Sequence, residues 1–153
     1  MLNPAGRLGY IAPSVWAVNE YGAGLRGVVA AGQHLDRWLD FKSFQVFEEA
    51  TTYTALQFFS KLPAPAIRVA QAPRGVVAPD PWAEAGARLD WGQEAFGDRW
   101  LLLTGPERAL VHRLAATCRR LDDPAHTAAI FTGLQTSADS IYHLQRRGPG
   151  QYT

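Results

Sequence analysis

The residues with the most chemical promise lie in one polar stretch, between Asp40 and Thr51. It contains Gln45, Val46 and Phe47, and two glutamates follow directly. Phe47 has polar and acidic neighbours and no apolar residue at a regular spacing to pack on. An aromatic ring on a loop above a rigid sheet can stack on a planar ligand such as a nucleobase. The alternative is that Phe47 packs beneath its own hairpin, and composition alone favours that alternative.

Other residue types give little support for a different chemistry. The single cysteine, Cys118, excludes an internal disulfide and a zinc site built from several thiolates. The four histidines do not have the spacing of metal ligands, so we expect no metal site. The chain also lacks a glycine-rich phosphate-binding loop, which argues against an unrelated nucleotide-binding α/β protein.

Length and composition describe a globular chain of moderate size. It has 153 residues, 47% hydrophobic content and a formal net charge of +1. Thirteen of the fifteen basic residues are arginine, a residue suited to phosphate and base contacts. A genome rich in G and C produces the same bias, and we give that explanation more weight. The chain has neither a long apolar run nor a cleavable signal, so we expect a cytoplasmic protein without membrane contact.

The spacing of apolar residues in the first sixty positions predicts a strand, a helix, a strand and a closing hairpin. Residues 8–12 form a short strand that ends at Pro13. Residues 19–32 have helical spacing, with Leu25, Val28, Val29 and Gly32 on one face and Asn19 as the cap. A strand follows around 35–41, and residues 51–59 form another, rich in β-branched and aromatic side chains. This order predicts half of a doubly wound α/β layer.

The second half of the chain differs in character. Five prolines and four glycines between residues 62 and 100 predict an extended connector, with Trp82, Trp91 and Trp100 as its anchors. The sequence from Thr104 to Glu107 predicts a capping box, in which the Thr104 hydroxyl accepts an amide proton and Glu107 reaches back. An apolar stripe from Leu110 to Leu121 follows. The arginines of this helix could lie on DNA phosphates, but a solvated face is the favoured interpretation. Strand-like segments are expected around 128–131 and 140–144.

Three stretches of the chain together resemble one protein family. They are NPAGRLGYIAPSVW at 3–16, DFKSFQVFEEATTYTALQFF at 40–59, and GLQTSAD at 133–139. They are similar to the later motifs of adenine-specific DNA methyltransferases of type II restriction-modification systems, particularly the fused restriction-and-modification enzymes. The resemblance covers about two thirds of the chain. It implies a partial Rossmann-like sheet in residues 1–62, a connector in 63–100, and the start of a target-recognition domain in 101–153.

The resemblance also implies roles for particular residues. In the family, the aromatic residue of the corresponding loop stacks on an adenine that has been flipped out of the DNA. Phe47 occupies that position here, with Gln45, Thr52 and Tyr53 beside it. Gln135 and Thr136 match the opening of the recognition domain and are candidates for DNA contact, although a turn held by the side chains of Thr136 and Asp139 is slightly favoured. The implied partner is double-stranded DNA, and the implied methyl donor of the parent enzyme is S-adenosylmethionine.

Motifs that the family needs for catalysis are absent from this sequence. The chain has no Asn-Pro-Pro-Tyr tetrapeptide, because Asn3 and Pro4 are followed by Ala5 and Gly6. The glycine-containing cofactor loop is absent too. We therefore expect no catalytic residue here, no S-adenosylmethionine binding by this chain alone, and a role as an internal part of a larger enzyme. A non-enzymatic module that binds nucleic acid or protein is the alternative. Half a sheet leaves an edge uncovered, so self-association is also expected.

Overall fold

The computed structural model describes residues 2–49, 51–84, 86–92, 96–121, 123–125, 146–148 and 151–152. The chain divides into two compact units, residues 1–114 and 115–153. The first unit holds an open, mixed β-sheet, and in the second unit the described strands are a short antiparallel pair, β6 (Arg146–Gly148) and β7 (Gln151–Tyr152). The expected strands around 128–131 and 140–144 lie outside the described residues.

The sheet of the first unit has the order β1-β3-β2-β4-β5 among the described strands. Its members are β1 (Arg7–Pro13), β2 (Leu35–Asp40), β3 (Thr54–Ser60), β4 (Ala66–Gln71) and β5 (Arg88–Asp90). Strand β3 is antiparallel to both β1 and β2, so β1 and β2 run in the same direction. Strand β2 is parallel to β4, and β5 is antiparallel to β4. The mixed α/β class is as the sequence predicts.

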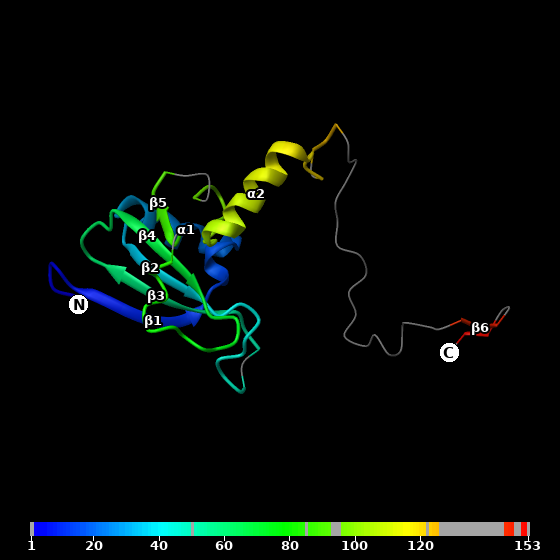
Figure 1. Cartoon of the computed structure of the whole chain (residues 1–153), viewed down its shortest axis with the longest axis horizontal. Helices are drawn as coiled ribbons and strands as arrows, with labels where there is room; N and C mark the ends of the chain where they lie inside the picture. The colour runs from blue at the N-terminus through cyan, green and yellow to red at the C-terminus, as the bar shows by residue number, and fades with distance from the viewer. Residues whose placement is uncertain are drawn as a thin grey trace. The chain divides into compact units, whose positions relative to one another are not determined.

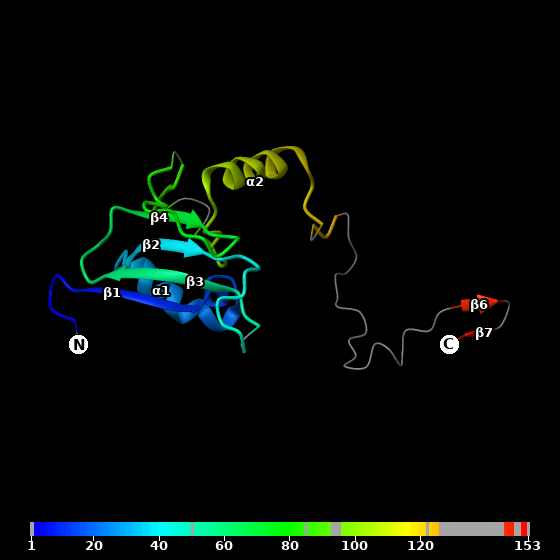
Figure 2. The same ribbon diagram turned by 60° about the horizontal axis from the view of Figure 1, so that its bottom comes forward.

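A helical layer covers one face of this sheet. It contains two short 3-10 turns, Val15–Ala17 and Glu20–Gly22, followed by α1 (Ala23–Ala31). Both views show α1 behind the strands (Figures 1 and 2). The larger part of the core lies under this layer and includes Trp16, Val29, Trp38, Ile67 and Trp100. A smaller cluster around Leu39, Phe41 and Ala70 lies on the opposite face.

The predicted helix at 19–32 is confirmed in part, but its buried face was predicted wrongly. Asn19 precedes a 3-10 turn and makes no side-chain cap hydrogen bond. Helix α1 buries Arg26 and Val29, whereas Leu25 and Val28 are exposed. The spacing of apolar residues predicted the wrong face because the buried position of Arg26 was not foreseen. Its guanidinium can be buried because backbone carbonyl oxygens accept its hydrogen bonds. The helix therefore presents an exposed surface of apolar and small residues.

The stretch predicted as an extended connector is not confirmed as one. It contains β4 and β5, whose side chains Ile67, Val69 and Leu89 are fully enclosed. The tryptophan anchors are confirmed, because the indole N–H of Trp82 donates to the carbonyl oxygen of Trp38, and that of Trp91 donates to Ala64. Prolines flank the two strands and do not interrupt them, so breaker density alone could not reveal these strands.

The predicted helix after Thr104 is confirmed as α2 (Gly105–Thr117), which crosses the boundary between the two units. Glu107 reaches back to the amide of Thr104, as the capping box requires. The Thr104 hydroxyl was predicted wrongly, because it donates to the Glu107 carboxylate instead of accepting an amide proton. The predicted apolar stripe is not buried, because α2 has no buried residue among those described.

Candidate base-stacking loop

The carboxyl ends of β1 and β2 lie at one end of the sheet, and the loop that joins β2 to β3 lies beside them. Backbone bonds hold both ends of this loop. The amide of Ser14, just after β1, donates to the carbonyl oxygen of Tyr53 at 2.9 Å, and its hydroxyl donates to the same oxygen at 3.1 Å. The amide of Phe41 donates to the carbonyl oxygen of Thr54 at 3.1 Å. Figures 1 and 2 show this cyan loop near the arrowhead of β1.

The first part of the loop is a tight turn. The Asp40 carboxylate accepts the amide proton of Lys42 at 2.6 Å, and Lys42 adopts a left-handed conformation with φ of 55°. Phe44 then packs over Gly75, where a Cβ atom would come within 2.3 Å of the ring. Val46 packs against the smaller core cluster. Phe44 and Val46 therefore anchor the loop to the sheet.

The predicted base-stacking residues lie together around this loop. The Phe47 side chain is 44% exposed, and Gln45 and Tyr53 are exposed as well. Thr52 is partly buried, and its carbonyl oxygen accepts the Thr54 hydroxyl proton at 3.3 Å. The ring of Phe47 is therefore partly accessible to solvent, and its role in base stacking stays a prediction. Gln135 and Thr136 lie outside the described residues.

A cavity of about 440 Å³ opens at the same end of the sheet. Its polar lining includes Ser14, Asp40, Lys42 and Tyr53, and Trp38 and Trp100 contribute aromatic surface. The indole N–H of Trp38 is buried and has no hydrogen-bond partner among the described residues. A buried donor without a partner is costly. Trp38 was not predicted to line this cavity, because its apolar neighbours in the sequence indicated only a core strand.

A second polar cluster fixes the start of α2 against the sheet. The Lys42 ammonium lies 3.1 Å from Glu107 Oε1 and 3.6 Å from Asp40 Oδ2. The Gln71 amide donates to Glu107 Oε2 at 2.5 Å. Partial burial raises the pKa of Glu107. The opposing effects are larger and lower this pKa to about 2: they are the hydrogen bonds from Gln71, the Thr104 amide and Lys42, and the positive charge of Lys42. The spacing of Thr104 and Glu107 predicted one member of this cluster, and no local signal predicted Gln71.

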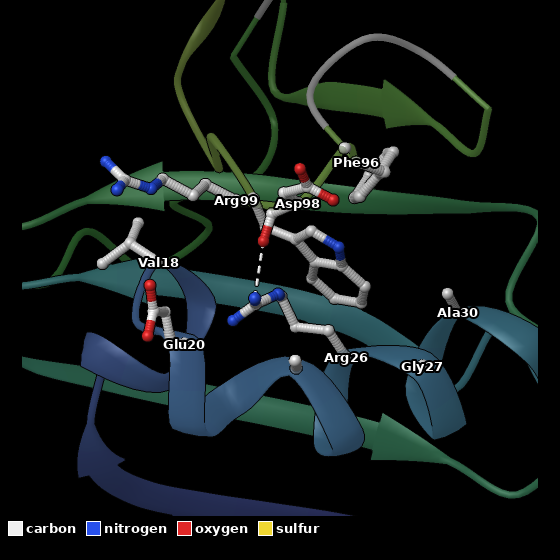
Figure 3. Close-up of a pocket in the computed structure, with 11 residues that line it drawn as sticks. Val18, Glu20, Arg26, Gly27, Ala30, Phe96, Asp98 and Arg99 are labelled. Atoms are coloured by element: carbon white, nitrogen blue, oxygen red, sulfur yellow. Dashed lines mark hydrogen bonds between the residues drawn. The ribbon is translucent and has the colours of Figure 1, made fainter.

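The neighbouring cavity, about 520 Å³ in volume, lies beside α1 and is organised by Arg26 (Figure 3). The Arg26 side chain is 6% exposed. Its Nη1 donates to the carbonyl oxygens of Trp16 at 2.6 Å and Asn19 at 2.7 Å. Its Nη2 donates to the backbone carbonyl oxygen of Asp98 at 2.5 Å. The dashed line in Figure 3 marks the bond to Asp98. Arg26 thus joins α1 to the turns before it and to the segment that carries Trp100.

Neither a cluster of metal-binding side chains nor a membrane-spanning helix is present in the described part of the chain. Within the part of the chain that the structure describes, no group of three or more His, Cys, Asp or Glu side chains could hold a metal ion. Among the described helices, none has the length and apolar character needed to cross a bilayer.

Comparison with known proteins identifies relatives, although no family model matches the chain. Type II methyltransferase M.XhoI of Xanthomonas vasicola is 30% identical over 158 residues, which cover 93% of this chain. Type II methyltransferase M.PaeR7I of Pseudomonas aeruginosa is 28% identical over 154 residues, or 92% of this chain. This chain is a homologue of type II methyltransferases. The resemblance drawn from the sequence motifs is therefore confirmed at that level.

A third relative matches a shorter stretch of this methyltransferase homologue. The type II restriction enzyme and methyltransferase RM.Eco57I of Escherichia coli is 39% identical over 61 residues, which are 40% of this chain and 6% of the relative. The chain spans 29% of M.XhoI and 26% of M.PaeR7I. The homology therefore concerns less than a third of each of these proteins.

Proposed function

We propose that this chain acts as part of a site-specific DNA adenine methyltransferase, in which the loop between β2 and β3 stacks on a flipped adenine. The observation that carries the proposal is the exposed ring of Phe47, on a loop that is anchored at the carboxyl ends of two strands running in the same direction. Ligands of open α/β sheets bind at this end of the strands. Homology to type II methyltransferases makes DNA the expected partner.

The proposed role of each residue follows from its place around the loop. Phe47 would provide the stacking face, because a ring offers π-surface to any base. Tyr53 and Thr52 would line the approach, and Gln45 lies two residues before the ring. The cavity that Ser14 and Tyr53 help to line would take up part of the extruded nucleotide. Extrusion costs a few kcal/mol, which stacking in the pocket helps to offset.

The methyl donor of such an enzyme is S-adenosylmethionine, which supplies the transferred methyl group. The described residues do not fit a site for it. The acidic group nearest the cavity, Asp40, is engaged by the amide and ammonium of Lys42, so it is not free to hold a ribose. We therefore assign cofactor binding and catalysis to parts of the enzyme other than these residues. Residues 101–153 would begin the DNA-recognition domain, with Gln135 and Thr136 among the DNA contacts.

A graft into a relative tests this proposal. Residues 41–53 of this chain would replace the aligned loop of M.XhoI, and methyl transfer to DNA would be measured with a radiolabelled donor. If the grafted loop stacks on the target base, the grafted enzyme should retain methyl transfer. The matched control graft carries the same residues in scrambled order, with Phe47 moved away from its position. Equal activity of the two grafts, or a folded first graft without activity, would contradict the assigned role.

A further inference from the structure

Lys42 has a backbone conformation that a lysine rarely adopts. It is the first central residue of a tight turn, which the amide of Phe44 closes by donating to the carbonyl oxygen of Phe41 at 3.0 Å. The φ angle of Lys42 is 55°, and Gly, Asn or Asp usually occupy such a position because other side chains are strained there. Strained residues persist where surrounding contacts hold them, and they cluster at functional sites. This turn begins the loop that carries Phe47.

Contacts from two elements, β2 and α2, hold Lys42 in this conformation. The carboxylate of Asp40, at the end of β2, accepts the amide proton of Lys42 at 2.6 Å, and its other oxygen lies 3.6 Å from the ammonium. The ammonium also donates to Glu107 Oε1 at 3.1 Å. Glu107 is the third residue of α2, so this bond joins segments that are 65 residues apart. A glycine would suit the backbone better, but it could not make this bridge.

Glu107 is itself held in place. Its second carboxylate oxygen, Oε2, accepts hydrogen bonds from the side-chain amide of Gln71 at 2.5 Å, and from the amide and hydroxyl of Thr104 at 2.9 and 3.0 Å. Gln71 ends β4 and lies opposite Asp40 of the parallel strand β2. The Glu107 carboxylate therefore bridges the end of β4 and the start of the loop, with Oε1 directed to Lys42.

We propose that Glu107, acting through Lys42, positions the loop so that the ring of Phe47 can stack on the flipped base, an inference that rests on the proposed function. The turn at Lys42 sets where Phe44 leaves the strand and packs over Gly75. Phe47 follows three residues later, so its direction depends on the same turn. Glu107 and Lys42 are positioning residues and do not themselves contact the base.

The surroundings of Lys42 disfavour a direct contact with a DNA phosphate. Its ammonium lies between the carboxylates of Asp40 and Glu107, so an approaching phosphate would meet two negative charges. The Lys42 side chain is also only 31% exposed. A positioning role uses the ion pair as it stands, whereas a phosphate contact would require the ammonium to leave both carboxylates.

The first test measures amide hydrogen exchange in this chain by NMR. Glu107→Gln and Lys42→Met should each speed exchange of the Phe44 amide by about three- to fivefold, the effect of losing a half-buried ion pair. Rates are taken relative to the Ser14 amide at the other end of the loop, which separates a local change from a general loss of stability. The double variant should exchange no faster than either single variant, because both changes remove one contact. Lys61→Met is the matched control and should have no effect, because its ammonium bonds a carbonyl oxygen outside the loop.

The second test uses a chimera in which this chain replaces the aligned region of M.XhoI. Lys42→Met and Glu107→Gln should each lower methyl transfer, and the fluorescence of 2-aminopurine at the target position, by about three- to fivefold. The affinity for S-adenosylmethionine should not change. In a Phe47→Ala background neither substitution should cause a further loss, because no ring is then left to position.

The outcomes separate this inference from the proposed function. Unchanged exchange of the Phe44 amide in both single variants would overturn the inference. A further loss of methyl transfer on adding Lys42→Met to the Phe47→Ala chimera would also overturn it, since Lys42 would then contact DNA directly. If Phe47→Ala lowers base extrusion while Lys42→Met and Glu107→Gln do not, only the inference fails. If Phe47→Ala leaves base extrusion undiminished, the proposed function fails and the inference with it.

Discussion

Two leucines on neighbouring strands of the same sheet have different surroundings. Leu8 of β1 and Leu35 of β2 both lie opposite Phe59 of β3. Leu35 is completely enclosed, whereas Leu8 is 43% exposed. The residue type and the strand partner are the same, so the difference comes from what covers each strand. Strand β2 has paired neighbours on both sides and lies under the helical layer, but β1 lies at the edge. Burial here is decided by position in the sheet.

Truncation of Leu8 and of Leu35 to alanine tests this difference most directly. Leu35→Ala should lower the free energy of unfolding by about 2–5 kcal/mol, because it leaves a cavity in an enclosed core. Leu8→Ala should change it by no more than about 0.5 kcal/mol, because solvent already reaches the side chain. Denaturant unfolding measures both. Similar losses for the two variants would show that β1 is covered in solution.

A second prediction concerns the layer that covers β2. Arg26→Met keeps much of the apolar stem but removes the donors that bind the carbonyl oxygens of Trp16, Asn19 and Asp98. Loss of these charge-assisted bonds should cost about 2–3 kcal/mol. Arg26→Lys should recover little of it, because an ammonium does not reproduce the geometry of the guanidinium. Thermal or denaturant unfolding measures the effect, and full rescue by lysine would contradict the assigned geometry.

The third prediction tests the cluster that holds the start of α2. Glu107→Gln should cost about 1 kcal/mol at neutral pH, because it weakens the hydrogen bonds from Gln71 and Thr104 and the ion pair with Lys42. The pKa of Glu107 is lowered from 4.5 to about 2. Its stabilisation is therefore complete above pH 4.5 and is lost as the pH falls toward 2.

The pH dependence separates this effect from a simple loss of packing. Unfolding free energies of the unaltered chain and of Glu107→Gln should converge as the pH falls from 4.5 to 2, since the variant has no carboxyl group to protonate at this position. Glu84→Gln is the control, because no interaction of the Glu84 carboxylate is part of this cluster. A constant difference between the unaltered chain and Glu107→Gln over this range would contradict the assigned role.

The sequence predicted the strands of the first sixty residues because their apolar patterns are strong. The side chains of β3 alternate between the two faces of the sheet, with Gln57 bonded to Trp16 on one side and Leu56 in the smaller cluster on the other. The buried face of α1 could not be predicted, because distant backbone carbonyls satisfy Arg26. Strands β4 and β5 were hidden by the prolines and glycines around them. Local pattern thus predicted the elements, while long-range bonds decided which residues are enclosed.

In the candidate site, too, local sequence patterns predicted one part and long-range contacts decided the rest. Its loop was predicted from the unusual setting of Phe47 and from family resemblance. The cavity, the unpaired Trp38 donor and the turn at Lys42 depend on residues from β1, β2 and the segment around Trp100, which are far apart in the sequence. Such contacts have no local signature.

The smallest effect on stability and the largest on function are expected at Phe47. Phe47→Ala should change the unfolding free energy by no more than about 0.5 kcal/mol, because Phe47 is 44% exposed and the loop is anchored by Phe44 and Val46. It therefore allows the functional role to be tested without loss of the fold.

The most direct measurement combines this substitution with the grafted M.XhoI enzyme. Grafts with Phe47 and with Phe47→Ala would be compared for methyl transfer to DNA, for S-adenosylmethionine affinity, and for the fluorescence of 2-aminopurine at the target position. The account predicts that Phe47→Ala lowers methyl transfer and base extrusion by about five- to 150-fold, as expected when stacking worth about 1–3 kcal/mol is removed. Cofactor affinity should stay unchanged. Undiminished methyl transfer and base extrusion without the ring would contradict the central claim.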